Sequence, residues 1–216
     1  MVGDTEVNSS FQDVKAYLAH LQETIAGLPV ELIDQVIGLL LASAQSGHKV
    51  FICGNGGSAS TASHFACDLA KNTKVDGAPR FRVIALTDNM ALMTAWANDT
   101  AYDNVFAAQL EPLIEPGDVV IGISCSGNSG NVLNAMALAR QHGALTVAFT
   151  GDIGGRLQAM VDVCVLAPSP RIEQQEDIHL ALEHCICVAL RNRLIQEYVP
   201  SREPIAATLP QTVMCH

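Results

Sequence analysis

The sequence is short of positive charge and of long apolar runs. It has 12 Lys and Arg against 22 Asp and Glu, a formal net charge of -10 at pH 7. Nucleic acids and anionic membranes bind basic surfaces, so this balance argues against both as general partners. An anionic small molecule is not excluded, because one site can be locally positive. No apolar run reaches the roughly 20 residues that span a bilayer. The polar start, MVGDTEVNSS, lacks the apolar core of a signal peptide.

The sequence also lacks paired cysteines. Seven cysteines, an odd number, are scattered without any CxxC spacing. Disulfide frameworks and many metal sites use paired spacings, so we interpret these residues as reduced, buried thiols of a cytoplasmic protein. A catalytic or metal-binding cysteine is the alternative. The cysteines are Cys53, Cys67, Cys125, Cys164, Cys185, Cys187 and Cys215.

What is present is an alternation of apolar runs and helical segments. A chain of 216 residues, 49% of them hydrophobic, can bury one α/β domain. Two amphipathic helices are expected first, at 9–28 and 30–47. Short runs rich in β-branched residues then predict strands at 49–53, 82–86, 119–123, 145–150 and 163–167. Helices are expected at 57–72, 90–97, 101–114, 129–142, 155–160 and 173–198.

This alternation predicts an α/β fold with a doubly wound, five-stranded parallel sheet flanked by helices, because strands without polar alternation are covered on both faces. We expect one domain over residues 1–216. It comprises N-terminal helices at 1–48, an α/β core at 49–198 and an irregular, proline-containing tail at 199–216. Such sheets bind ligands outside the carboxyl ends of their strands, where the strand order reverses.

Two loops that follow strands are unusual. The first is Gly54–Ser58, within ICGNGGSASTASH, and the second is Ser124–Gly130, which follows the apolar run DVVIGI. The second offers three hydroxyls, two glycines and a helix start within seven residues. Backbone N–H groups and serine hydroxyls at a helix N-terminus form an anion cradle, and phosphate is its natural guest. The alternative is an ordinary strand-to-helix turn, which needs only one capping serine.

The first loop also has the spacing G-x-G-x-x-A, through Gly54, Gly56 and Ala59. This spacing occurs in dinucleotide sites, but alone it is a weak signal. The acidic residue expected about 20 positions further on is missing. We therefore disfavour a dinucleotide.

Histidines and carboxylates share helical faces in two places. His64 and Asp68 are four residues apart on the helix that follows the first loop. The run QQEDIHLALEHCICVAL places Glu176, His179, Glu183 and His184 on the last helix, with Glu176 and His184 about two turns apart. Such residues form a zinc site or an acid–base site. The alternative is an interhelical ion pair with a buried structural histidine.

Three segments together resemble one family. CGNGGSASTASHFACDLA, LTDNMALMTAWANDTAYDNVFAAQLE and GDVVIGISCSGNSGNVLNA resemble the sugar isomerase (SIS) fold, and specifically its phosphoheptose isomerase group. The resemblance covers roughly residues 10–195. It implies conversion of sedoheptulose 7-phosphate to a heptose 7-phosphate, zinc as the cofactor, and a homotetramer with active sites near subunit interfaces.

The resemblance also implies roles for individual residues. Substrate contacts fall on Asn55, Gly56, Gly57, Ser58, Asn98, Asp99, Ser124, Cys125, Ser126, Ser129 and Glu176. The metal ligands fall on His64, Asp68, Glu176 and His184, and the catalytic groups on Asp68, His184 and Glu176. Cys125 stands where the family usually has threonine.

Two further departures affect the acid–base set. Asp68 stands where the family has glutamate, and Glu176 where it has glutamine, although Gln174 or Gln175 is an alternative counterpart. We favour an aldose–ketose phosphosugar isomerase that works through an enediolate. A non-enzymatic SIS protein, either a phosphosugar-sensing regulator or a replication-initiation adaptor, is the alternative that the shorter Asp68 leaves open.

Overall fold

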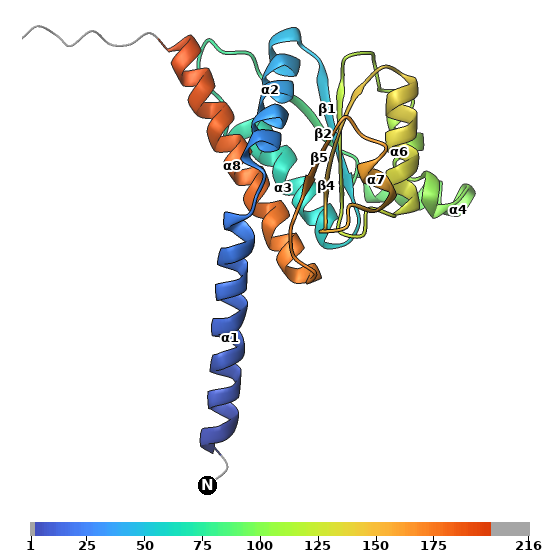
Figure 1. Ribbon diagram of the computed structural model, residues 1–216. Helices are drawn as coiled ribbons and strands as arrows, with labels where there is room; N and C mark the ends of the chain where they lie inside the picture. The colour runs from blue at the N-terminus through green and yellow to red at the C-terminus, as the bar shows by residue number, and fades with distance from the viewer. Residues whose placement is uncertain (1–2, 200–216) are drawn as a thin grey trace, which may run out of the picture.

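A five-stranded parallel sheet forms the centre of the computed structural model, which describes residues 3–199 (Figure 1). Its strand order is β2-β1-β3-β4-β5. All four strand pairings are parallel. The strands are β1 (Lys49–Gly54), β2 (Arg82–Ala85), β3 (Val119–Ser124), β4 (Leu145–Thr150) and β5 (Val163–Leu166). The predicted fold class is confirmed.

Helices cover both faces of this sheet. They are α1 (Gly3–Ala26), α2 (Val30–Ser46), α3 (Gly57–Lys71), α4 (Met90–Asp99), α5 (Ala107–Leu110), α6 (Gly130–Gln141), α7 (Gly155–Gln158) and α8 (Ile172–Tyr198). Figure 1 shows α2, α3 and α8 on one face and α6 and α7 on the other.

The central strand β3 shows why the apolar runs lack polar alternation. Every residue of β3 is buried. Val119 and Ile121 face the core under α2, α3 and α8, whereas Val120 faces the core under α5, α6 and α7. Successive side chains of a strand point to opposite faces, so both faces demand apolar residues.

The segment 101–114 differs from the single helix that we expected. It forms a short 3-10 helix, Tyr102–Asn104, and the separate short helix α5. Pro112 follows α5 closely, and a proline disfavours helical backbone at the residue before it. Residues 200–216, including Cys215 and His216, lie outside the described part of the chain, so the expectation for the tail is not addressed.

The strand order reverses between β1 and β3. The chain passes from β1 outward to β2 and then returns to the other side of β1, where β3 pairs with it in a register that joins Gly54 to Ile123. The loops after β1 and β3 therefore leave the same edge of the sheet as neighbours. This is the position at which doubly wound sheets bind ligands.

Helix α1 extends away from the sheet and touches α8 near its start (Figure 1). The Tyr17 hydroxyl donates to Asp177 Oδ2 at 2.5 Å, and the buried Gln174 amide donates to the Tyr17 carbonyl at 3.2 Å. His20 Nδ1 lies 2.6 Å from Gln174 Oε1. His20 is half-buried and joins α1 to the first turn of α8.

Among the described residues, no single helix has the length and apolar character to cross a membrane. Only the bent pair Gln12–Ala26 and Val30–Ser46, with 67° between the two helices, passes that test by length and composition.

Candidate functional site

The serine loop after β3 lines a hollow of about 220 Å³. Ser124 Oγ and Ser129 Oγ lie 3.1 Å apart, and Ser126 Oγ accepts the Asn128 N–H at 3.1 Å. The hollow opens at the N-terminus of the 12-residue helix α6. Hydroxyls and free N–H groups at a helix start are donors for an anion. The predicted site residues that line this hollow are Asn55, Ser58, Ser124, Cys125, Ser126, Ser129 and Glu176.

Gly127 fixes the shape of the serine loop. Its φ is +61°, a left-handed value that favours glycine. A Cβ at Gly127 would also lie 2.0 Å from the carbonyl oxygen of Gly154. The Leu157 N–H donates to the Gly127 carbonyl at 2.9 Å. The loops after β3 and β4 are therefore packed backbone to backbone, which holds the serines in place.

Asn55, from the first loop, is held on two sides. It exchanges hydrogen bonds of 2.9 Å with Asn131 of α6, and its Oδ1 also accepts the Tyr102 hydroxyl at 2.8 Å. Sequence reasoning missed Asn131 and Tyr102. Asn131 directly follows the serine loop, but only the folded chain places it opposite Asn55.

Glu176 reaches the same hollow from α8. Its carboxylate lies so close to Gly57, the first residue of α3, that a Cβ there would sit 2.2 Å from Oε1. Glycine at position 57 thus permits this approach. Gln174, Gln175 and Glu176 are the three candidates for the counterpart of the family glutamine. The Gln174 side chain contacts His20 of α1 instead, and the Gln175 amide donates to the Ser169 carbonyl at 2.7 Å. Among the described residues, only Glu176 of these three lines the serine hollow.

The Cys125 side chain is a neutral part of this hollow. Burial and the nearby Glu176 charge raise the pKa of the Cys125 thiol, against a smaller lowering by a hydrogen bond with Ser58. A raised pKa keeps the thiol protonated at neutral pH, whereas nucleophilic cysteines have lowered values. The alternative of a catalytic cysteine gains no support at this position.

A second group of side chains lies where α3 packs against α8. It contains His64 and Asp68 of α3 with Glu183 and His184 of α8. Glu183 Oε1 lies 3.4 Å from His64 Nδ1 and 3.3 Å from His184 Nε2. Asp68 Oδ1 lies 3.8 Å from His64 Nε2, and Asp68 Oδ2 lies 3.9 Å from His184 Nε2. One ligand atom from each residue falls within 4.8 Å of all the others.

Glu183 is the most unusual member of this group. Its side chain is fully buried, and neither carboxylate oxygen has a hydrogen-bond partner. Burial and the Asp68 charge raise the pKa of Glu183 to about 8. Burying a carboxylate without hydrogen bonds costs free energy, so a ligand that contacts both oxygens would stabilise the folded protein. Two imidazoles and two carboxylates are nitrogen and oxygen donors that suit zinc, so the group fits a divalent metal ion.

The second group differs from the expected metal ligands in one residue. His64, Asp68 and His184 are together as expected, but Glu183 stands where we expected Glu176. Glu176 lies instead against Gly57 in the serine hollow. Glu183 is in the same sequence run, yet nothing in its spacing showed that it faces α3.

Asn98 and Asp99 are not brought to the serine hollow of their own chain. Both lie in the last turn of α4, which has no buried residue and extends from the body in Figure 1. The Asn98 amide donates to Asp99 Oδ1 at 2.9 Å. Their expected contact with substrate stays a prediction.

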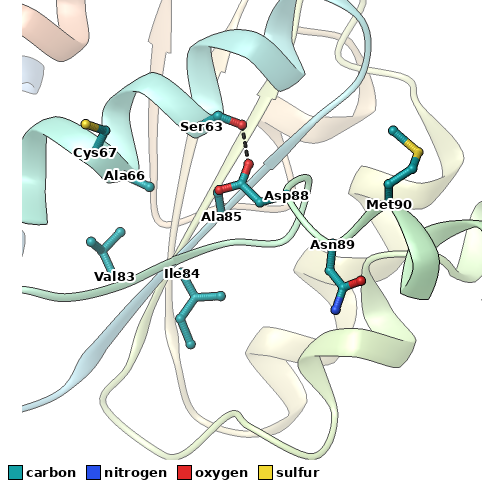
Figure 2. Close-up of a pocket in the computed structure, with 9 residues that line it drawn as sticks. All are labelled: Ser63, Ala66, Cys67, Val83, Ile84, Ala85, Asp88, Asn89 and Met90. Carbon is teal, nitrogen blue, oxygen red and sulfur yellow. Dashed lines mark hydrogen bonds between the residues drawn. The ribbon is translucent and has the colours of Figure 1, made fainter.

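A larger hollow, of about 710 Å³, lies beside the edge strand β2. Figure 2 shows β2 residues Val83, Ile84 and Ala85 along it, with Cys67 of α3 opposite. The Ser63 hydroxyl donates to Asp88 at its rim. None of the expected site residues lines this hollow, so we do not assign the chemistry to it.

His179 supports the site from within α8. It is fully buried, and its Nε2 lies 3.1 Å from the carbonyl oxygen of Thr150, the last residue of β4. Burial lowers the pKa of His179 to about 4, against a smaller raising by this hydrogen bond. His179 is therefore neutral at pH 7 and joins α8 to the carboxyl end of β4.

We expect His179 to make folding sensitive to acid. An unfolded histidine binds its proton near pH 6.5, so unfolding takes up a proton between about pH 6.5 and 4. The corresponding stability is complete above pH 6.5 and falls by about 3 kcal/mol as the pH drops to 4. Urea denaturation of wild-type protein and His179→Gln at pH 7, 6 and 5 should show the gap in unfolding free energy narrowing with acid. The exposed His142→Ala is the control, and a constant gap for His179→Gln would contradict the assignment.

Comparison with known proteins identifies the class of this fold. The SIS domain family matches residues 11–151. The chain therefore belongs to the SIS domain family.

Relatives within that family narrow the assignment. A phosphoheptose isomerase of Aliarcobacter butzleri is 40% identical over 186 residues, which cover 84% of this chain and 96% of the relative. A phosphoheptose isomerase structure from Neisseria gonorrhoeae is 34% identical, with a TM-score of 0.77, and covers 84% of this chain and 98% of that one. A second phosphoheptose isomerase structure, from Francisella tularensis, is 31% identical with a TM-score of 0.76. The match covers 89% of this chain and 100% of that one. Within the SIS family, the chain belongs to the phosphoheptose isomerase group.

Proposed function

We propose that this protein is an aldose–ketose isomerase that converts sedoheptulose 7-phosphate to a heptose 7-phosphate. The observation that carries the proposal is the pairing of two sites along α3. The serine hollow lies at the start of α3, and the histidine–carboxylate group lies two to three turns further along it. An anion cradle can hold the phosphate of a sugar, while acid–base groups can act on its carbonyl end.

The geometry of the serine hollow supports a set of phosphate contacts. The hydroxyls of Ser124, Ser126 and Ser129 would donate to phosphate oxygens, together with N–H groups at the start of α6. Asn55, Gly56, Gly57 and Ser58 would contact the sugar from the first loop. Asn98 and Asp99 would contact substrate in the assembled oligomer.

The reaction needs a proton to move between C1 and C2 of the open-chain sugar. A carboxylate base takes the proton from C1, the C–H electron pair forms the C1–C2 double bond, and an acid protonates the C2 oxygen. Loss of the O1 proton and protonation at C2 then complete the aldose. We assign this proton transfer to Asp68 and His184. Glu176, which we expected as a substitute base, lies instead with the serines of the phosphate hollow. His64, Asp68 and His184, with a carboxylate of α8, would hold one zinc ion, and such an ion supplies Lewis-acid stabilisation of an oxyanion.

Solvent exchange tests this activity directly. The protein is incubated with sedoheptulose 7-phosphate in heavy water, with and without zinc, and the products are followed by NMR. We expect an aldose phosphate that carries deuterium at C2, and no reaction with unphosphorylated sedoheptulose. Absence of both aldose and exchange with C5 to C7 ketose phosphates would support the non-enzymatic alternative.

We also propose that the chain forms a homotetramer with active sites near the subunit interfaces. Val14, Leu18 and Ile25 are exposed on α1, which extends from the body (Figure 1). Val188 and Ile195 are exposed on α8. Apolar side chains that are left uncovered in one chain are a common mark of a subunit interface.

We expect light scattering coupled to size-exclusion chromatography to give four times the chain mass at micromolar concentration. Val14→Glu combined with Leu18→Glu should shift the protein to smaller species, because a buried unpaired charge is costly. Gln22→Glu is a charge-changing control at an exposed residue of the same helix. A wild-type monomer would contradict the proposal.

The domain and its location complete the proposal. We infer one SIS domain over the whole chain, with α1 and α2 as its N-terminal extension. We further propose a cytoplasmic location, because the six cysteines in residues 3–199 are all free and reduced thiols are typical of that compartment.

A further inference from the structure

We propose that two carboxylates of α8 have separate roles. Glu183 is the fourth ligand of the metal-binding group. Glu176 lines the serine hollow, where its charge weakens phosphate binding, and does not bind the metal. This inference rests on the proposed function and deepens it. It assigns a ligand that spacing did not reveal and removes one that spacing suggested.

The position of Glu176 along α3 separates it from the metal group. Its carboxylate lies against Gly57, the first residue of α3. His64 follows seven residues later, a rise of about 10 Å along the helix, and Asp68 follows after a rise of about 16 Å. Zinc binds its ligands at about 2 Å, so they must converge within a few ångströms. The Glu176 carboxylate lies at the wrong end of α3 for that.

Glu183 has the opposite relation to the same group. Its Oε1 is within 3.4 Å of His64 Nδ1 and within 3.3 Å of His184 Nε2. Neither contact has hydrogen-bond geometry, so neither oxygen of this fully buried side chain has a hydrogen-bond partner. Asp68, by contrast, already accepts a hydrogen bond of 2.6 Å from the Asn72 amide. A metal ion is the partner that both Glu183 oxygens lack.

Access to the group is open from one side. A hollow of about 350 Å³ is lined by His64, Asp68 and His184. His64 and His184 keep nearly half of their side-chain surface exposed, although Glu183 behind them has none. A cation can thus enter from solvent and meet Glu183 at the back of the group.

Glu176 should act on phosphate through its charge. It lines the same hollow as Ser124, Ser126 and Ser129. A carboxylate repels a phosphate dianion at short range, and the repulsion is strong where the surroundings exclude water. Replacing Glu176 by neutral glutamine should therefore strengthen binding of inorganic phosphate while leaving zinc affinity unchanged.

The decisive experiment measures zinc affinity by competition with a chromophoric chelator, in the full-length wild type, Glu183→Gln and Glu176→Gln. We expect Glu183→Gln to weaken zinc binding by about 100-fold or more, since even indirect supports of a metal ligand are worth about 10- to 100-fold. Glu176→Gln should match the wild type. Isothermal titration with inorganic phosphate should give tighter binding for Glu176→Gln than for the wild type.

Thermal stability gives a second measurement that does not depend on turnover. In metal-free protein, Glu183→Leu removes an unpartnered buried carboxylate, so we expect its Tm to rise above that of the wild type. Zinc should raise the Tm of the wild type and of Glu176→Gln, but not that of Glu183→Leu. If Glu183→Leu does not fold, Glu183→Gln gives the same comparison.

Several outcomes would overturn the inference. These are loss of zinc affinity in Glu176→Gln, equal loss in both variants, or wild-type affinity in Glu183→Gln. None of these results bears on whether the enzyme isomerises a sugar phosphate. Conversely, absence of isomerase activity would refute the proposed function while leaving the zinc and phosphate measurements intact.

Discussion

Removing two hydroxyls of the serine loop, by Ser124→Ala with Ser126→Ala, is expected to lower kcat/KM for the sugar phosphate by roughly 100-fold to 10,000-fold. A hydrogen bond to a charged group is worth roughly 1.5–3 kcal/mol, and about 1.4 kcal/mol corresponds to a factor of ten. The phosphate does not react, so most of the loss should appear in KM.

The effect on folding should be small in comparison. Ser124 Oγ contacts Ser129 Oγ, and Ser126 Oγ accepts one exposed N–H. Steady-state kinetics with matched thermal melts separates the two effects. Ser46→Ala, an exposed serine at the far end of α2, is the control. An unchanged KM in the double variant would mean that the phosphate binds elsewhere.

The second large effect is expected at the metal group. His64→Ala with His184→Ala removes both imidazoles, and the two remaining carboxylates are a poor set for zinc, which favours nitrogen and sulfur ligands. We expect the purified double variant to lose its metal and its isomerase activity together. Elemental analysis of the protein as purified provides the measurement.

A matched control is available in His142→Ala, because His142 is exposed on the surface at the end of α6. This variant should keep both metal and activity. If the double variant contained as much metal as the wild type, the group would hold no ion. His64, Asp68 and His184 would then be an acid–base set supported by ion pairs.

The fold was predictable because its signal is local. The inner strands β1, β3 and β4 are apolar runs that are buried on both faces, as Val119, Val120 and Ile121 of β3 illustrate. The helices that follow β1 and β3 begin at glycine- and serine-rich loops. The order of these elements, with the general rules for parallel sheets, is sufficient to bring the loops after β1 and β3 together. The segment 101–114 was mispredicted because its apolar spacing suits a helix, although Pro112 limits how far one can extend.

The serine hollow was also largely predictable. Ser124, Ser126 and Ser129 lie within one loop, so their meeting needs only the local turn that Gly127 permits. The hydrogen bonds between Asn55 and Asn131 could not be predicted, because these residues are 76 positions apart in the sequence. Asn98 and Asp99, which the family resemblance placed at the substrate, lie apart from this hollow within one chain.

By itself, then, the sequence determined the sheet, the serine loop and the shared face of His64 and Asp68, because strand and helix periods fix which residues of one element point the same way. Only the tertiary structure decided which level of α8 lies opposite that face. The crossing of α3 and α8 places Glu183 beside His64 and sets Glu176 against Gly57. Helical spacing predicts which residues share one face of a helix, but not where a second helix crosses that face. The crossing of α3 and α8 therefore decides that Glu183, and not Glu176, lies beside His64.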